Sequence, residues 1–195
     1  STPLDLEAAE FVAAAAGGEA FWALVEAAGD SFASRSEKER YEVIRMQVDA
    51  ALGAAGTALL DVSLSTREYS PMVQMYRQIA AGAWRDAGKG DVPCAFAIVD
   101  GKAASTVDEL GALVQACSGV AEDAGLHDFD HVFPTGALKD GAPTAVLYGR
   151  IGSPEFRAFH TELSKLSKAG EVAYVARHAD CGCSAAACAD SATFN

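Results

Sequence analysis

The sequence predicts an α/β domain in which a helical part precedes a sheet-bearing part. Apolar residues in the first half recur at helical spacing, whereas the second half alternates short apolar runs with helix-start signals. Two of those runs flank a single helix, and such a strand–helix–strand unit joins parallel strands by a right-handed crossover. We expect one domain over residues 1–178, helical at about 19–81 and sheet-bearing at about 94–178, followed by a flexible tail at 179–195.

The helical part is expected to contain three helices. Two of them follow from apolar residues spaced three or four positions apart, which are Phe21, Leu24, Val25 and Ala28, then Tyr41, Ile44, Val48 and Leu52. The third begins at Ser70-Pro71, because serine caps helices and proline suits the first helical position. Residues 59–64 are expected to add a short apolar turn, and the glycines and proline of residues 81–93 indicate a loop.

The sheet-bearing part begins with a predicted hairpin. Residues 94–99 form a short apolar run, and Asp100-Gly101 tolerates the positive φ of a tight turn before a return strand at 102–105. Thr106 then caps a helix that carries acidic residues in its first turn. Residues 119–141 are expected to be irregular.

The strand–helix–strand unit completes the domain, with strands expected at 144–148 and 171–177. Between them, Ser153-Pro154 begins a helix and Ala169-Gly170 ends it. His160 on this helix is expected at the edge of the core rather than as a catalytic base. The side chains expected to face the sheet recur at helical spacing and are Phe156, Phe159 and Leu163.

The composition argues against several classes of partner. The 195 residues hold 27 acidic and 15 basic side chains, which gives a net charge of −12. Such a surface repels phosphate backbones and anionic lipids, so we expect no nucleic acid and no membrane among the partners. No apolar run approaches the roughly 20 residues that span a bilayer.

The segment from His127 to His131 is the most suggestive candidate metal site. Asp128 and Asp130, separated by one residue, can hold a divalent cation, and the flanking histidines His127 and His131 suit zinc or manganese. The two carboxylates share a face only if the chain is extended there. We therefore favour a solvated loop, with a small metal-binding module as the alternative.

The cysteines offer a second candidate site. Cys181, Cys183 and Cys188 crowd the tail, and His178 precedes them. Only one residue separates the first two cysteines, whereas structural zinc sites of this kind have at least two. The tail also lacks large apolar residues over 179–192, so we expect it to be dispensable for folding. An incidental disulfide is compatible with this interpretation, and a metal or redox site is the alternative.

Several segments, taken in order, resemble one known family. They are Thr2-Pro3-Leu4, Glu10-Phe11, Phe21-Trp22, residues 64–70, His131-Val132-Phe133-Pro134, Ile151-Gly152, Tyr174-Val175 and Arg177-His178. This ordered set resembles the N-terminal end of UDP-glucose:glycoprotein glucosyltransferase, the folding sensor of the endoplasmic reticulum. The resemblance implies a thioredoxin-like domain with a helical insertion, within a protein several times longer than this chain.

The same resemblance implies a role without catalysis. The family transfers glucose from UDP-glucose to glycans of misfolded glycoproteins, using an Asp-x-Asp motif and a divalent cation in a C-terminal domain. Asp128-Phe129-Asp130 lies in the wrong part of the protein to be that motif, so we expect neither catalytic residues nor a cofactor here. The implied partners are misfolded glycoproteins, other domains of the same chain and a small selenoprotein oxidoreductase, all in the endoplasmic reticulum lumen.

The place of a redox thiol can be checked directly. Thioredoxin-like folds carry it at a helix N-terminus, where the helix dipole lowers the thiol pKa. Residues 150–155 occupy that junction without a cysteine, and Ser153 is interpreted as the N-cap. A free-standing thioredoxin-like oxidoreductase that uses the tail cysteines is the alternative function. Cys94 matches one cysteine of a family pair, but its counterpart is replaced near Ser105, so Cys94 is expected to be a free thiol or to have another partner.

Overall fold

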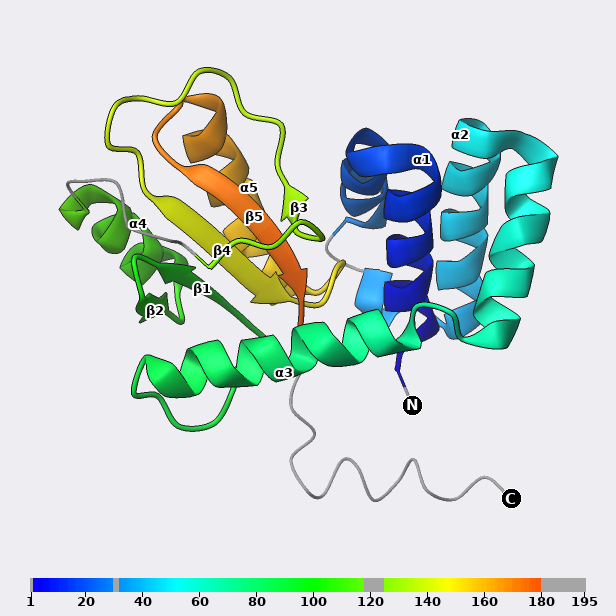
Figure 1. Ribbon diagram of the computed structural model, residues 1–195, viewed down its shortest axis with the longest axis horizontal. Coiled ribbons are helices and arrows are strands. Elements are labelled where there is room, and N and C mark those ends of the chain that lie inside the picture. The colour runs from blue at the N-terminus through cyan, green and yellow to red at the C-terminus, as the bar shows by residue number, and fades with distance from the viewer. Residues whose placement is uncertain (1, 30–31, 118–124, 180–195) are drawn as a thin grey trace.

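The computed structural model describes residues 2–29, 32–117 and 125–179 of the chain. Within these ranges the fold is α/β, as predicted, with helices on both faces of a mixed sheet and a helical part beside it (Figure 1). The elements in chain order are α1 (Leu4–Ala28), the 3-10 turn η1 (Phe32–Ser34), α2 (Glu37–Thr66), α3 (Ser70–Asp86), β1 (Ala95–Val99), β2 (Lys102–Ala104), α4 (Val107–Ala116), β3 (His131–Val132), β4 (Thr144–Gly149), α5 (Pro154–Lys168) and β5 (Ala173–His178). The predicted tail lies outside the described residues, apart from Ala179.

The sheet has the strand order β2-β1-β4-β5-β3. β4 and β5 run parallel and are joined through α5, whereas the other neighbouring strands pair antiparallel. This arrangement confirms the predicted strand–helix–strand unit. The predicted hairpin is also confirmed, because Asp100 and Gly101 adopt φ values of +48° and +71° between β1 and β2.

Helices cover both faces of the sheet. On one face, α5 buries Phe156, Phe159 and Leu163 as predicted. On the other face, α3 places Trp84 against Phe96, with ring centroids 4.8 Å apart. Because β1 is covered on both sides, its sequence is apolar without alternation.

The helical part consists of α1 and α2, which pack together beside the sheet (Figure 1). Each changes direction at a glycine: Gly17 has a φ of +84° and Gly53 a φ of +68°, and such values strain other residues. Helix begins at Leu4, which corrects the expected start near residue 19. Residues 59–64 belong to α2 and are not a separate turn. The alanines of residues 13–16 provide no stripe of large apolar side chains, so periodicity does not mark them as helical.

α3 is longer than predicted and belongs to the sheet layer. It continues to Asp86 and so includes part of the loop expected over 81–93. A glycine inside a helix costs about 1 kcal/mol, and burying a large aromatic side chain nearby stabilises the fold by about 1.5–3 kcal/mol. Gly82 is therefore tolerated two residues before the buried Trp84. The helix starts at Ser70-Pro71 as predicted, but Tyr69 is the N-cap.

β3 lies within the stretch predicted to be irregular. It has two residues and pairs with β5 at the edge of the sheet. Two residues are too few for an alternating pattern to be recognised. The pairing matters because it brings the loop before β3 against the end of β5.

α1 and α2 are long and apolar enough, by length and composition alone, to cross a membrane. This is weak evidence, because half of the relevant window of α1 is buried inside the domain. Both helices are also interrupted at the glycines described above, so each unbroken segment is shorter than the roughly 20 residues of a membrane span. We interpret both as helices of the packed domain.

Candidate functional site

The junction between β4 and α5 is where a thioredoxin-like fold carries its redox thiol. Ser153 stands there, and its Oγ accepts a hydrogen bond of 3.1 Å from the backbone N–H of Phe156. The predicted N-cap is therefore confirmed. Its hydroxyl accepts a hydrogen bond from one of the otherwise unpaired N–H groups of the first turn, and a hydroxyl cannot form a disulfide.

The helical part covers this junction. Gly152 has a φ of +78°, and a Cβ atom at that position would lie 2.3 Å from the Cβ of Phe32. Phe32 and Ser153 are both buried. Nearby, Arg150 Nη2 lies 3.0 Å from Asp5 Oδ2, which ties the same junction to the first turn of α1. The junction thus lacks a thiol and is also closed by the packing of the helical part.

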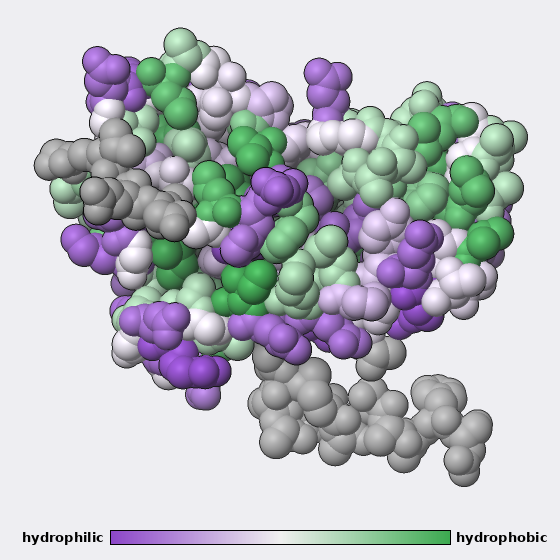
Figure 2. All heavy atoms as spheres, in the orientation of Figure 1, coloured by the Kyte–Doolittle hydropathy of each residue, from purple (hydrophilic) through white to green (hydrophobic). Residues whose placement is uncertain are grey.

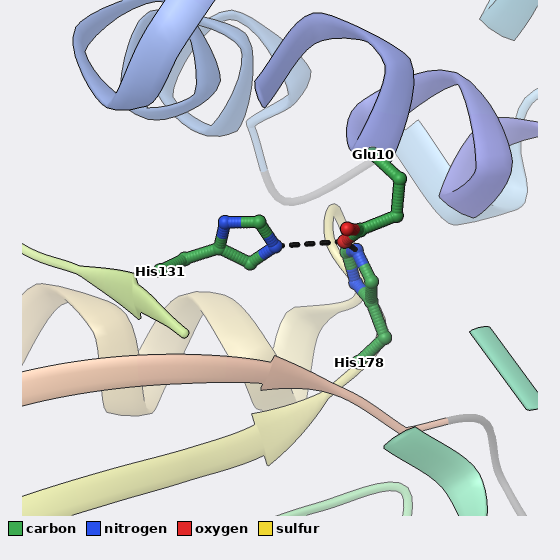
Figure 3. A group of neighbouring side chains, drawn as sticks. All are labelled: Glu10, His131 and His178. Atoms are coloured by element: carbon green, nitrogen blue, oxygen red, sulfur yellow. Dashed lines mark hydrogen bonds and ion pairs between the residues drawn. The ribbon is translucent and has the colours of Figure 1, made fainter. Parts of the chain in front are cut away.

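A second site lies where α1 meets the end of the sheet (Figure 3). Glu10 comes from α1, His131 from β3 and His178 from the end of β5. The Nε2 atoms of His131 and His178 lie 2.7 Å and 2.6 Å from the same oxygen, Glu10 Oε1. The three residues are only 5%, 8% and 1% exposed, respectively for Glu10, His131 and His178. They form a buried polar cluster, called here the Glu–His–His cluster.

The surroundings keep Glu10 ionised and hold the rings in place. Burial by itself raises the pKa of Glu10, but the hydrogen bond with His131 and the neighbouring His178 outweigh it and lower the pKa to about 2. Phe21 stacks on the His131 ring with centroids 3.8 Å apart. The ring of Tyr76 meets His178 edge-on at 5.5 Å.

The four residues of the candidate metal site at 127–131 do not contact a common point in the structure. Asp130 accepts two hydrogen bonds, each of 2.7 Å, from the guanidinium of Arg177. His127 and Asp128 are exposed, and a turn separates them from the strand that follows. His131 belongs instead to the Glu–His–His cluster. The four candidate ligands therefore do not converge on one point, which does not support a metal module built from them. The favoured interpretation as a solvated loop fits the exposed His127 and Asp128 but is wrong for the buried side chains of Asp130 and His131.

The cysteines are placed only in part. Cys94 is disulfide-bonded, which corrects the expectation of a free thiol and leaves the alternative of another partner. Cys117 is a free, half-buried cysteine. Cys181, Cys183 and Cys188 also lie outside the described residues, and the expectations for them stay predictions.

An apolar surface remains on α2. Met46, Leu59 and Val62 are 70%, 60% and 59% exposed, and they are three of the six exposed large apolar side chains among the described residues. Met46 also lines a cleft of about 580 Å³ between the two segments of α2, together with polar residues such as Glu42 and Asp61. Figure 2 shows hydrophobic surface over this end of the molecule. Exposed apolar groups rimmed by polar ones are typical of surfaces that contact other chains.

Sequence reasoning did not assemble the Glu–His–His cluster. Glu10 and His131 are 121 positions apart, so no local spacing connects them. His178 precedes the tail cysteines and belongs to one of the segments that carry the family resemblance, but neither setting connects it with Glu10. Glu10 sits in an Ala-rich helix and carries no motif of its own. Only the pairing of β3 with β5, and the docking of α1 on that edge, bring the three together.

The topology and the closed junction define a thioredoxin-like domain in which Ser153, rather than a cysteine, stands at the usual redox position. A family model of thioredoxin-like domains matches residues 1–181, and the chain belongs to that family. It is similar to UDP-glucose:glycoprotein glucosyltransferase 1 of Homo sapiens, at 35% identity over 181 residues, and to UDP-glucose:glycoprotein glucosyltransferase 2 of Homo sapiens, at 33% over 180 residues. The Drosophila melanogaster UDP-glucose:glycoprotein glucosyltransferase is 29% identical over 184 residues.

These alignments cover 91% of this chain but only 11–12% of the relatives. The chain thus spans about a ninth of the length of the proteins it matches. The predicted resemblance to these glucosyltransferases and the thioredoxin-like fold are both confirmed. The matched part is thioredoxin-like, and no glucosyltransferase domain is shown in it.

Proposed function

We propose that this chain is a non-catalytic folding-sensor domain that helps a UDP-glucose:glycoprotein glucosyltransferase recognise misfolded glycoproteins in the endoplasmic reticulum lumen. The observation that carries the proposal is the β4–α5 junction. Ser153 replaces a redox thiol there, and Phe32 from the helical part packs over the adjacent Gly152. A domain whose usual redox position lacks a thiol and is covered by packed side chains is suited to binding rather than to thiol exchange.

The exposed apolar surface of α2 supplies a place for client contact. Non-native chains expose apolar side chains, and burial of apolar area drives their association with such a surface. Met46, Leu59 and Val62 provide that area. Charged residues that line the same cleft as Met46, including Glu42 and Arg45, give this surface a polar rim.

The first experiment tests catalysis. The purified 195-residue chain is assayed for reduction of insulin and for glucose transfer from UDP-glucose to an unfolded glycoprotein. We expect neither reaction. Insulin reduction above that of a variant with Cys181, Cys183 and Cys188 changed to serine would support the oxidoreductase alternative instead. Glucose transfer would contradict the assignment of catalysis to a separate domain.

The second experiment tests client binding. Binding of a disulfide-bonded glycoprotein is measured in its reduced and alkylated form and in its native form, and we expect the chain to bind the first more tightly. The double variant Met46→Ser, Leu59→Ser should weaken that binding about tenfold, because two exposed apolar contacts are lost.

The matched control is Leu138→Ser, which removes an exposed leucine that lies in a loop away from α2. It should leave binding unchanged. Equal binding of native and unfolded forms, or equal loss in the control, would contradict a client surface on α2.

A further inference from the structure

We propose that Glu10, His131 and His178 bind a divalent metal ion, with Zn²⁺ as the best-fitting cation, and that this ion fastens α1 to the edge of the sheet. The inference is independent of the folding-sensor function. It rests on the arrangement of three side chains, on one ring nitrogen that lacks a hydrogen bond, and on a cleft that opens beside the cluster.

The arrangement is that of a three-ligand metal site. One carboxylate oxygen and two imidazole nitrogens lie within 4.8 Å of one another. Two histidines and one glutamate are a ligand set that zinc uses in proteins, with bonds of about 2.0–2.2 Å and a fourth position left for water. No thiolate is needed, and the set is softer than the all-oxygen sets that calcium and magnesium prefer.

His178 carries the second observation. Its Nε2 is fully buried and, among the described residues, has no hydrogen-bond partner, although Glu10 Oε1 lies 2.6 Å away. The approach of that oxygen is therefore not along the direction of a hydrogen bond. His131 does meet hydrogen-bond geometry with the same oxygen. A buried ring nitrogen that faces a carboxylate oxygen at 2.6 Å without hydrogen-bond geometry calls for an explanation, and a bound ion between the two atoms is one.

The close N–O distances are compatible with an ion after a small movement. A tetrahedral zinc ion separates its ligand atoms by about 3.3 Å. The carboxylate of Glu10 must therefore withdraw from the two rings by about half an ångström to an ångström. Glu10 is on a long side chain with several rotatable bonds, whereas the rings are held by Phe21 and Tyr76.

A route for the ion and room for its fourth ligand are present. Glu10 and His131 line a cleft of about 440 Å³, which is also bordered by Tyr69, Met72 and Asp128. The cleft opens between α1, α3 and the residues before β3. A water molecule in it can complete the coordination, while the three protein ligands stay buried.

The test is a zinc titration of the full chain after its free thiols have been capped with iodoacetamide, which removes the cysteines as competing ligands. Calorimetry should report one zinc per chain. The melting temperature should rise by about 5–10 °C at a free zinc concentration about 100-fold above Kd, because the ion binds the folded chain only. Absence of binding and of any rise in melting temperature would overturn the proposal.

Two matched carboxylate variants locate the ion. Glu10→Gln keeps the size of the side chain and removes the ligand charge, so zinc affinity should fall by about 100-fold or more. Asp128→Asn makes the same chemical change in the same cleft, outside the cluster, and should leave the affinity unchanged. The reverse result would place the ion at the His127–Asp128 segment and overturn the assignment.

A third measurement does not depend on how Glu10→Gln folds. With ¹⁵N-labelled histidine in the wild-type chain, zinc should shift the ring-nitrogen signals of two of the four histidines. The same two shifts should persist in His127→Gln. Shifts confined to His127 and His160, or no shifts, would contradict the site.

Discussion

α5 and α2 are both helices of the same domain, but they use their apolar side chains differently. α5 buries Phe156, Phe159 and Leu163 against the sheet and keeps its charged residues at least partly in solvent. α2 buries Ile44 and Leu60 but leaves other large apolar side chains in solvent. Both helices have the same backbone hydrogen bonding, and a serine caps the N-terminus of each. What differs is the surface that each helix has to cover, so apolar content alone does not reveal which helix makes the core and which provides a surface.

The largest difference between the two helices is expected in how much a truncated apolar side chain lowers the free energy of unfolding. Phe159→Ala should destabilise the chain by about 3–5 kcal/mol, because it removes a buried aromatic side chain and leaves a cavity. Met46→Ala on α2 is the matched control and should change stability by less than about 0.5 kcal/mol. Urea unfolding of both variants measures this. A loss below about 1 kcal/mol for Phe159→Ala would mean that α5 is misplaced.

Buried and exposed ion pairs should differ in the same way as buried and exposed apolar side chains. The side chain of Asp130 is fully buried and accepts two hydrogen bonds from Arg177, which also donates one to the hydroxyl of Tyr148 at 2.8 Å. Asp130→Asn leaves the buried guanidinium without its counter-charge and should cost about 3 kcal/mol.

Glu171→Gln is the control for that ion-pair prediction. It removes one partner of the Lys139–Glu171 pair, in which both side chains are exposed. An exposed pair contributes about 0–1 kcal/mol. Equal losses in the Asp130 and Glu171 variants, measured by urea unfolding, would contradict the distinction between buried and exposed pairs.

The caps of the two helices give a smaller and more direct comparison. Ser153 caps α5 in a buried setting, and Ser36 caps α2 in an exposed capping box with Glu39. Ser153→Ala should cost about 1–2 kcal/mol and Ser36→Ala about 0.5–1 kcal/mol, because water can replace the lost bond only at the exposed cap. Thermal unfolding of the two variants tests the order, and a larger effect at Ser36 would reverse it.

The last prediction concerns pH. His160 on α5 is buried between Tyr174 and the half-exposed Glu26, at 2.9 Å from each, which fits its expected place at the edge of the core. Burial lowers its pKa, despite the opposing effect of Glu26. The unfolded chain therefore binds the proton first, and the stability present above about pH 6.5 declines as the pH falls below that value.

His160→Gln should make this decline shallower. The measurement is the urea midpoint of the wild type and the variant at several pH values from 7.5 to about 5. An equally steep decline in the variant would assign the pH dependence to other groups. The carboxylate of Glu26 is about half exposed, so its contribution is expected to be screened.

Features that depend on neighbours in the chain were predictable. Thr106 caps α4 through the N–H of Glu109, and Asp100-Gly101 forms the hairpin, because cap and turn preferences act over a few residues. Helix ends that lack such a signal were misjudged. α1 starts at Leu4 without a side-chain cap, and α3 passes through Gly82 because Trp84 packs on the sheet.

The sequence by itself determined the α/β class, the strand–helix–strand unit and the absence of a cysteine at the β4–α5 junction, since each is a local pattern or a residue identity. Only the tertiary structure decided that Phe32 closes that junction and that Cys94 is disulfide-bonded. It also decided that His131 contacts Glu10 in a cluster with His178, whereas its neighbour in the chain, Asp130, pairs with Arg177. The physical reason is that side chains pair across space, and desolvation on burial favours partners that the folded backbone brings close, whatever their separation in the chain.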